Sequence, residues 1–134
     1  MNKETAQSLS AFLIAHADIP EEEVKISDRI PYMFKIKAMD SQLYSELYKA
    51  NTTISRKGKA SFNAMGFNVA LIRECCVNPD FKDAEFLKAC GCFTPDDAIQ
   101  RLLRPGEIVN LAGFISELSG FDKTVDDLKD EVKN

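Results

Sequence analysis

The sequence predicts an α+β fold that is predominantly helical, with one antiparallel β-hairpin packed against a bundle of five to six helices. Two short segments alternate between apolar and polar residues, whereas most later segments carry apolar residues at helical spacing. Capping residues, glycines and prolines separate these segments. With 134 residues and 45% hydrophobic content, the chain can bury one sizeable core. We therefore expect a single globular domain over residues 1–121.

The first helix is predicted over residues 5–16. Its apolar-face positions, spaced by three and four, are Leu9, Phe12, Leu13 and His16. His16 is the only histidine in the chain, and we expect it to be partly buried and bonded to a neighbouring carbonyl rather than to act as a ligand or general base. The segment lacks the charged n-region and cleavage site of a secretory signal, so a cytoplasmic location is expected.

The antiparallel hairpin is predicted over residues 23–38. Its inward-facing residues follow a period of two, which indicates half-buried strands; they are Val24, Ile26, Phe34, Ile36 and Ala38. Asp28 and Pro31 favour a turn between the strands. Lys35 and Lys37 on the outer face suit an exposed edge strand, because lysines there discourage edge-to-edge pairing.

A second helix is predicted to begin at Asp40 or Ser41, either of which can act as its cap, and to end near Asn51. The basic segment that follows has Gly58 at its centre and predicts a mobile loop or a short hairpin tip. Contact with phosphates is an alternative for this loop, but a solvated turn is the preferred interpretation.

The third helix is predicted to begin after Asn63 and to lie at the centre of the domain, because it is apolar around most of its circumference. The Asn-Pro-Asp sequence at 78–80 is expected to end it.

Three further helices have clear boundaries. Asp83 and Gly91 bound a short one, and Thr94 followed by Pro95 begins the next. A break at Pro105 precedes the last predicted helix, and Gly120 ends it. Residues 122–134 carry eight charges, which predicts a flexible tail that is a marginal helix at best.

No catalytic motif is found in the chain. It contains no GxGxxG, Walker, GxSxG or HExxH pattern, so we expect neither an enzyme nor a cofactor. A formal net charge of -4 argues against nucleic acid as the main ligand. No apolar run approaches the roughly 18 residues of a membrane span, so no membrane partner is expected.

Four cysteines suggest one alternative, a zinc-stabilised adaptor that uses Cys75, Cys76, Cys90 and Cys92. Structural zinc sites usually pair cysteines two to four residues apart on tight turns. Cys75 and Cys76 instead lie within an apolar helical pattern, where neighbours diverge by about 100 degrees. We therefore favour free, buried thiols and predict no metal site. Another alternative is a helical DNA-binding regulator of phage origin, but its candidate helical pair, residues 95–119, has only Arg101 and Arg104 as basic residues.

Three stretches together resemble the XkdN-like family of phage tail assembly chaperones. The first is PYMFKIKAM with the helix SQLYSELYKA, and the second is FNVALIRECCVNPDFKDAEFLKACG. The third is FTPDDAIQRLLRPGEIVNLAGFISELSGF, and the likeness runs from about residue 5 to residue 122. The adjacent cysteines and the CGC depart from the small or aliphatic residues expected there. The resemblance brings no catalytic or cofactor residue.

The resemblance implies a non-catalytic chaperone of phage or prophage origin that binds the tape measure protein and helps tail tube subunits assemble around it. It also implies that the protein is absent from the mature virion. A chaperone for a helical client needs apolar surface to share. Aromatic and aliphatic residues outside the main helical stripes are the candidates for client binding or self-association, namely Tyr44, Tyr48, Phe81, Phe93, Val109 and Phe114.

Overall fold

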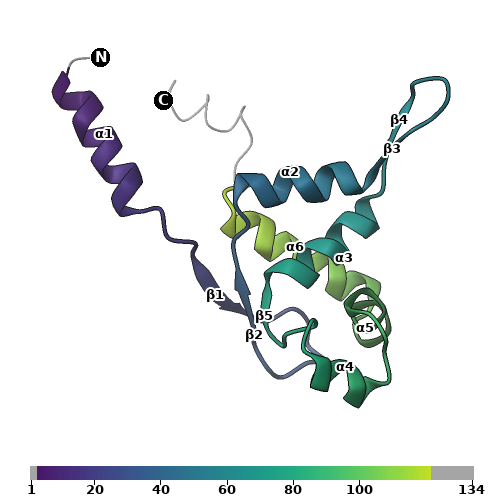
Figure 1. Cartoon of the computed structure of the whole chain (residues 1–134). Coiled ribbons are helices and arrows are strands. Elements are labelled where there is room, and N and C mark those ends of the chain that lie inside the picture. Colours follow the sequence, from purple (N-terminus) through teal and green to yellow (C-terminus); the bar gives the residue numbers. More distant parts are fainter. Residues whose placement is uncertain (1–2, 122–134) are drawn as a thin grey trace.

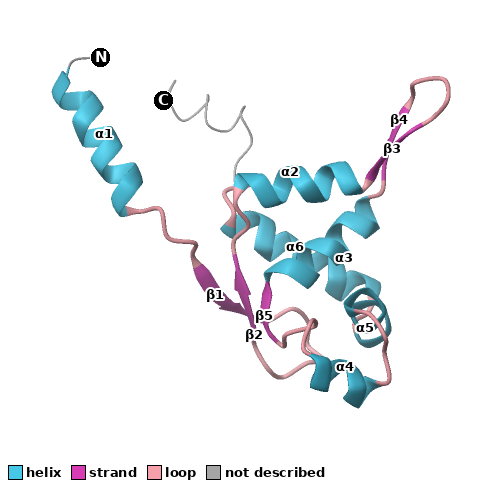
Figure 2. Ribbon diagram, in the orientation of Figure 1, coloured by secondary structure: helices cyan, strands magenta, loops and turns pink. Residues whose placement is uncertain are grey.

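The computed structural model describes residues 3–121, which form six helices and five short strands. In chain order they are α1 (Lys3–Ala15), β1 (Glu21–Val24), β2 (Phe34–Lys37), α2 (Ser41–Ala50), β3 (Thr52–Ile54), β4 (Ala60–Phe62), α3 (Ala64–Cys75), β5 (Cys76–Asn78), α4 (Ala84–Cys90), α5 (Pro95–Leu102) and α6 (Pro105–Leu118). The predicted mainly helical α+β class is confirmed (Figures 1 and 2). The predicted tail, residues 122–134, lies outside the described residues.

The core is centred on the contact between α3 and α6. The helices α2, α4 and α5 lie around this pair. Leu71 and Ile72 of α3 are 0% exposed, as are Leu111 and Ile115 of α6. The predicted central position of the third helix is therefore confirmed. Among the described residues, no helix is both long and apolar enough to cross a bilayer.

The predicted hairpin is confirmed, and a third strand completes its sheet. β1 pairs antiparallel with β2, β2 pairs antiparallel with β5, and the strand order is β1-β2-β5. The prediction that the lysine-bearing strand is an edge strand is wrong, because β5 covers its other side and leaves Lys35 and Lys37 half-buried. The core helix also ends at Cys75, earlier than predicted, because the next three residues form β5.

The helix boundaries follow their capping residues. Four caps accept a hydrogen bond from the backbone N–H three residues on, at 2.8 to 3.1 Å, and they are Asp40, Asn63, Asp83 and Thr94. Gly91 and Gly120 have φ values of +71° and +103°, the left-handed conformation that ends a helix at low cost when the residue is glycine. The basic segment after α2 forms the β3–β4 hairpin, so the hairpin interpretation is confirmed.

Helix α1 extends away from the body of the domain (Figure 1), and no extensive contact joins it to another described helix or strand. The single domain expected over residues 1–121 includes this helix. His16 is exposed, and the expectation that it is partly buried is wrong because no extensive contact joins α1 to another element within residues 3–121. Its predicted local bond is present, since His16 Nδ1 lies 2.9 Å from the carbonyl oxygen of Phe12.

A buried carboxylate fixes the β1–β2 connection to the start of α6. Glu107 is 4% exposed and accepts two hydrogen bonds from the guanidinium of Arg29, both at 2.7 Å. Ser27 Oγ donates to it at 2.6 Å, and the backbone N–H of Arg104 donates at 2.8 Å. The Arg29 hydrogen bonds lower the pKa of Glu107 to about 2 despite its burial, and Ser27 and Arg104 add to this effect. The carboxylate thus stays charged in the folded protein.

Candidate functional site

An open groove lined by aromatic side chains lies where α2, β4, α3 and the end of α6 meet. We call it the aromatic groove, and its volume is about 300 Å³. The residues that line it are Met39, Tyr44, Tyr48, Phe62, Phe67, Ser116 and Phe121. Tyr48, Phe62 and Phe121 are 44%, 42% and 55% exposed, so much of its lining faces solvent.

Direct ring contacts connect the five aromatic residues. Tyr48 and Phe62 stack with ring centroids 4.7 Å apart, and Phe62 lies 5.5 Å from Phe67. Tyr44 connects the other end of the groove, since its ring lies 5.3 Å from that of Phe121. Aromatic contacts at these distances contribute roughly 0.5–1.5 kcal/mol each beyond area burial. The rings therefore form a preorganised apolar surface.

Local sequence features place these rings together. Tyr44 and Tyr48 are one helical turn apart on α2, so they lie on the same face. The β3–β4 hairpin turns the chain back at once, and its register puts Phe62 opposite Thr52, the first residue after the cap of α2. The backbone N–H of Asn63 then donates to the carbonyl of Asn51 at 2.8 Å and closes the hairpin base.

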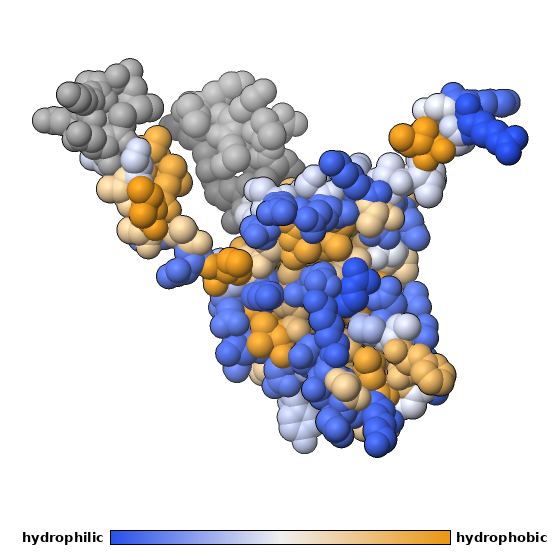
Figure 3. Space-filling view, in the orientation of Figure 1, coloured by the Kyte–Doolittle hydropathy of each residue, from blue (hydrophilic) through white to orange (hydrophobic). Residues whose placement is uncertain are grey.

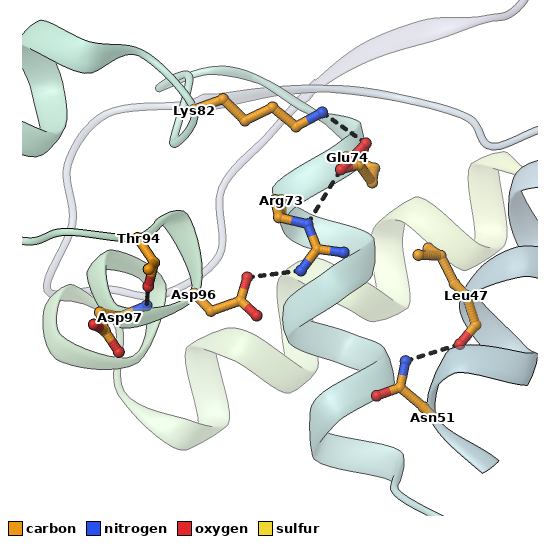
Figure 4. Close-up of polar contacts among 8 residues, drawn as sticks. All are labelled: Leu47, Asn51, Arg73, Glu74, Lys82, Thr94, Asp96 and Asp97. Carbon is orange, nitrogen blue, oxygen red and sulfur yellow. Dashed lines mark hydrogen bonds and ion pairs between the residues drawn. The ribbon is translucent and has the colours of Figure 1, made fainter.

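Gly66 permits the tight junction between α2 and α3. A Cβ at this position would lie 2.5 Å from Asn51 Oδ1 and 2.6 Å from Asn63 Nδ2. The Asn63 side chain accepts the capping hydrogen bond of α3 from Gly66, and the Asn51 side chain donates to the carbonyl of Leu47 (Figure 4). A larger residue would displace both side chains, so the glycine keeps Phe67 close to α2.

The structure brings only two of the six predicted contact residues into the aromatic groove. Tyr44 and Tyr48 line it. Phe93 is 96% exposed beside α4, and Val109 is 51% exposed on α6. Phe114 is half-buried against the core.

Phe81 has to be removed from the candidate surface. It is 1% exposed, and its ring meets that of Phe86 edge to face at 5.5 Å. We expected it to lie in a turn and therefore at the surface. The turn carrying it instead folds inward between β5 and α4, which makes Phe81 one of the largest fully buried side chains.

Sequence reasoning missed three of the five aromatic residues of the groove. Phe67 lies in the predicted core helix and Phe121 follows the glycine that ends the last predicted helix, and neither was among the surface candidates. The backbone N–H of Phe121 donates to the Ser116 carbonyl at 3.0 Å, and its ring lies against Tyr44 of α2. Phe62 belongs to the hairpin that was described only by its charges. The sequence did contain a signal for this hairpin. Apolar residues, Ile54 and Phe62, flank the basic turn on its two sides, as expected for two short strands joined by a turn.

The charged side chains around α3 form a network of ion pairs. Arg73 Nη1 lies 2.8 Å from Asp96 and its Nε lies 3.1 Å from Glu74 (Figure 4). Lys82 extends this network, because its Nζ lies 2.6 Å from the carboxylate of Glu74. These pairs join α3 to α5 and to the turn before α4, so they connect elements of the body.

The four cysteines do not gather around a common point. Cys75 and Cys76 are buried where α3 passes into β5, whereas Cys90 and Cys92 flank the end of α4. Within residues 3–121, no group of three or more His, Cys, Asp or Glu side chains could hold a metal ion. Burial raises the pKa of Cys75 to about 11 and that of Cys76 to about 12, which favours inert thiols over metal-binding thiolates. Nothing in this arrangement favours the zinc adaptor.

The helical pair considered for DNA binding lies in the body of the domain. α6 packs along α3, and both Ala98 and Ile99 of α5 are 0% exposed. Arg101 is directed toward the end of α4, where its Nη1 lies 3.5 Å from the carbonyl of Gly91. The pair thus presents neither a free recognition helix nor a basic face.

Comparisons with known proteins agree with the resemblance. The family model for the phage XkdN-like tail assembly chaperone protein matches residues 9–133. The uncharacterised protein YqbN of Bacillus subtilis (strain 168) is 31% identical over 98% of this chain and 96% of its own length. The XkdN protein of the phage-like element PBSX, from the same strain, is 28% identical over 92% of this chain and 93% of its own. The crystal structure of the protein YqbN matches with a TM-score of 0.62 and 29% identity, covering 77% of this chain and 87% of that one.

Proposed function

Because the chain belongs to the XkdN-like family of phage tail assembly chaperones, we propose that it binds the tape measure protein through the aromatic groove. In this proposal it performs no catalysis. It shields apolar helices of the client until tail tube subunits assemble around them.

The observation that carries the proposal is the groove itself. It is open, and its lining consists almost entirely of aromatic and other apolar side chains. Grooves of this kind take the apolar face of an amphipathic helix, whose anchors recur at spacings of three and four. Tyrosine and phenylalanine supply large contact area at a low cost in side-chain entropy, so a few rings can hold a helix.

The same geometry suits a client that must later be released. The groove is open to solvent, and its exposed rings already contact one another before any client arrives. A single helix seated there buries a small interface, which is typical of transient complexes. Affinity would then come from several chaperone copies along a long client rather than from one tight contact.

Co-expression with fragments of the tape measure protein tests the proposal. The Tyr48→Ser and Phe62→Ser double variant should lose most of the fragment-solubilising effect, because it removes the stacked pair of rings and most of the apolar contact area that they provide. The measurement is the soluble fraction of the fragment on gels, beside circular dichroism of each purified chaperone. Phe93→Ser is the matched control, because it removes an exposed ring outside the groove.

Two outcomes would contradict the proposal. One is an equal soluble fraction of the fragment with and without the wild-type chain. The other is full solubilisation by the double variant, which would place the client elsewhere on the molecule.

We further propose that the protein acts in the cytoplasm of the host cell and leaves before the tail is complete. A groove that releases its client would keep the chaperone out of the finished particle. Immunoblots of purified virions and of the lysate should find the chain in the lysate alone, at a stage when tail tube protein is present in both. Stoichiometric chain in intact virions would reject this part of the proposal.

A further inference from the structure

The last described residue, Phe121, already lies in the aromatic groove. Its ring centroid is 5.3 Å from that of Tyr44, and its side chain is part of the groove lining. Gly120, with a φ of +103°, turns the chain after α6, and the backbone N–H of Phe121 holds this turn by donating to the Ser116 carbonyl at 3.0 Å. Residues 122–134 therefore follow directly from a residue that is fixed in the groove.

The sequence after Phe121 continues an apolar stripe that begins with this residue. Val125, Leu128 and Val132 follow it at spacings of four, three and four. An amphipathic helix that binds in an apolar groove presents its anchors at this spacing. A segment with so few apolar residues is a marginal helix by itself and is stabilised mainly by packing its apolar face on another surface. The first member of the stripe already occupies such a surface.

The groove and the segment agree in length and direction. Along the groove, the ring centroids of Tyr44 and Tyr48 are 5.9 Å apart, and those of Tyr48 and Phe62 are 4.7 Å apart. Val125 and Val132 are seven residues apart, which is about 10 Å in a helix. In Figure 1 the end of α6 lies beside the start of α2, and the β3–β4 hairpin follows the end of α2. A segment that follows the groove from the end of α6 thus runs along α2 toward the hairpin.

The charges of the segment and of the hairpin are opposite in sign. Residues 122–134 contain five acidic residues and three lysines. Two acidic pairs separate the apolar positions, namely Asp126 with Asp127 and Asp130 with Glu131. The hairpin tip contains Arg56, Lys57 and Lys59, all exposed. Figure 3 shows that the hairpin is hydrophobic near its base and hydrophilic at its tip, so it suits an apolar stripe flanked by acidic residues.

We propose that residues 122–132 occupy the aromatic groove of their own molecule, with Val125, Leu128 and Val132 against the rings and the acidic pairs toward the basic hairpin tip. No linker separates the segment from the groove, so its effective concentration there is high and few contacts are enough to hold it. One consequence rests on the proposed function. A client helix has to displace the segment, so the apparent client affinity falls with the fraction of grooves that the segment occupies.

A cross-link within one chain locates the segment. The Tyr48→Cys and Leu128→Cys double variant, oxidised with glutathione disulfide at low protein concentration, should form a disulfide within the monomer that mass spectrometry maps to these two positions. The Phe93→Cys and Leu128→Cys variant is the matched control and should not form the corresponding bond, because Phe93 lies outside the groove. Three outcomes would overturn the proposal: no bond at position 48, equal linkage to both positions, or a linked dimer in place of a linked monomer.

Amide hydrogen exchange tests the same contact without added cysteines. Amides of residues 124–132 should exchange at least about tenfold more slowly in the wild type than in the Val125→Ser, Leu128→Ser and Val132→Ser triple variant, because the variant removes the stripe. The Lys123→Ser, Lys129→Ser and Lys133→Ser triple variant is the control, and it should keep the slow exchange because its stripe is intact. Equal exchange in the wild type and the stripe variant would contradict the proposal.

Client binding separates this inference from the proposed function. The stripe variant should bind a tape measure fragment about threefold or more tightly than the wild type does, because its groove is free. The measurement is a titration of the labelled fragment with each protein. A fragment that binds neither protein would reject the proposed function alone and leave the cross-link and exchange results to decide the contact. Equal binding by both proteins would overturn the displacement step.

Discussion

Replacing Glu107 by glutamine is expected to lower the free energy of unfolding by about 2–3 kcal/mol, one of the largest effects of a single isosteric change in this chain. Glutamine keeps the size of the side chain, but it removes the negative charge that accepts two hydrogen bonds from Arg29 and one from Ser27. The side chain of Glu107 is 5% exposed, so water cannot replace these partners. Urea unfolding followed by circular dichroism measures the loss.

The dependence of stability on pH gives the same prediction a second readout. The folded pKa of Glu107 is about 2, below the ordinary value of 4.5, so folding favours the charged form. Its stabilisation is complete above pH 4.5 and is lost as the pH falls from 4.5 through about 2. The glutamine variant should lack this part of the acid sensitivity.

Glu117→Gln is the matched control, because it makes the same change at an exposed position of α6. It should alter stability by less than about 0.5 kcal/mol. Equal effects of the two substitutions, or an acid-unfolding curve of Glu107→Gln that matches the wild type, would contradict the role assigned to Glu107.

Most of the helical fold could be predicted because helix boundaries depend on local chemistry. Asp83 and Gly91 each act within one turn of α4, and Thr94 does so at the start of α5. The sheet was harder to predict because its third strand contains only three residues, too few to show a period of two, and pairs with a segment about forty positions away. The position of α1 relative to the rest of the domain was the hardest feature to predict, because an apolar helix face gives the same sequence pattern whether it is packed or exposed.

In the candidate site, too, residues of one helix could be predicted together, whereas residues that come from distant segments could not. Tyr44 and Tyr48 could be identified together because they share one helical face. Phe62 and Phe121 reach them from β4 and from the residues after α6, and no local pattern indicates that these segments converge. Phe81 and Phe93 are both in turns, and only the path of the chain decides which of them enters the core.

Phe81 and Phe93 give the second prediction, in which the same substitution to alanine strongly destabilises the protein at one position and hardly affects it at the other. Phe81→Ala is expected to lower the free energy of unfolding by about 3–5 kcal/mol, because it removes a ring that is 1% exposed and leaves a cavity between the turn and α4. Phe93→Ala should change stability by less than about 0.5 kcal/mol, because that ring is 96% exposed. Urea unfolding of both variants beside the wild type gives the comparison.

The contrast also decides how client assays are to be interpreted. Phe81→Ala should reduce the yield of soluble tape measure fragments only as far as it reduces the folded fraction of the chaperone. The groove variants at Tyr48 and Phe62 should reduce that yield while the chaperone remains folded, because their rings are 44% and 42% exposed and carry less of the core. A Phe81→Ala protein as stable as the wild type would show that its turn does not occupy the core. The candidate binding surface would then have to include Phe81 after all.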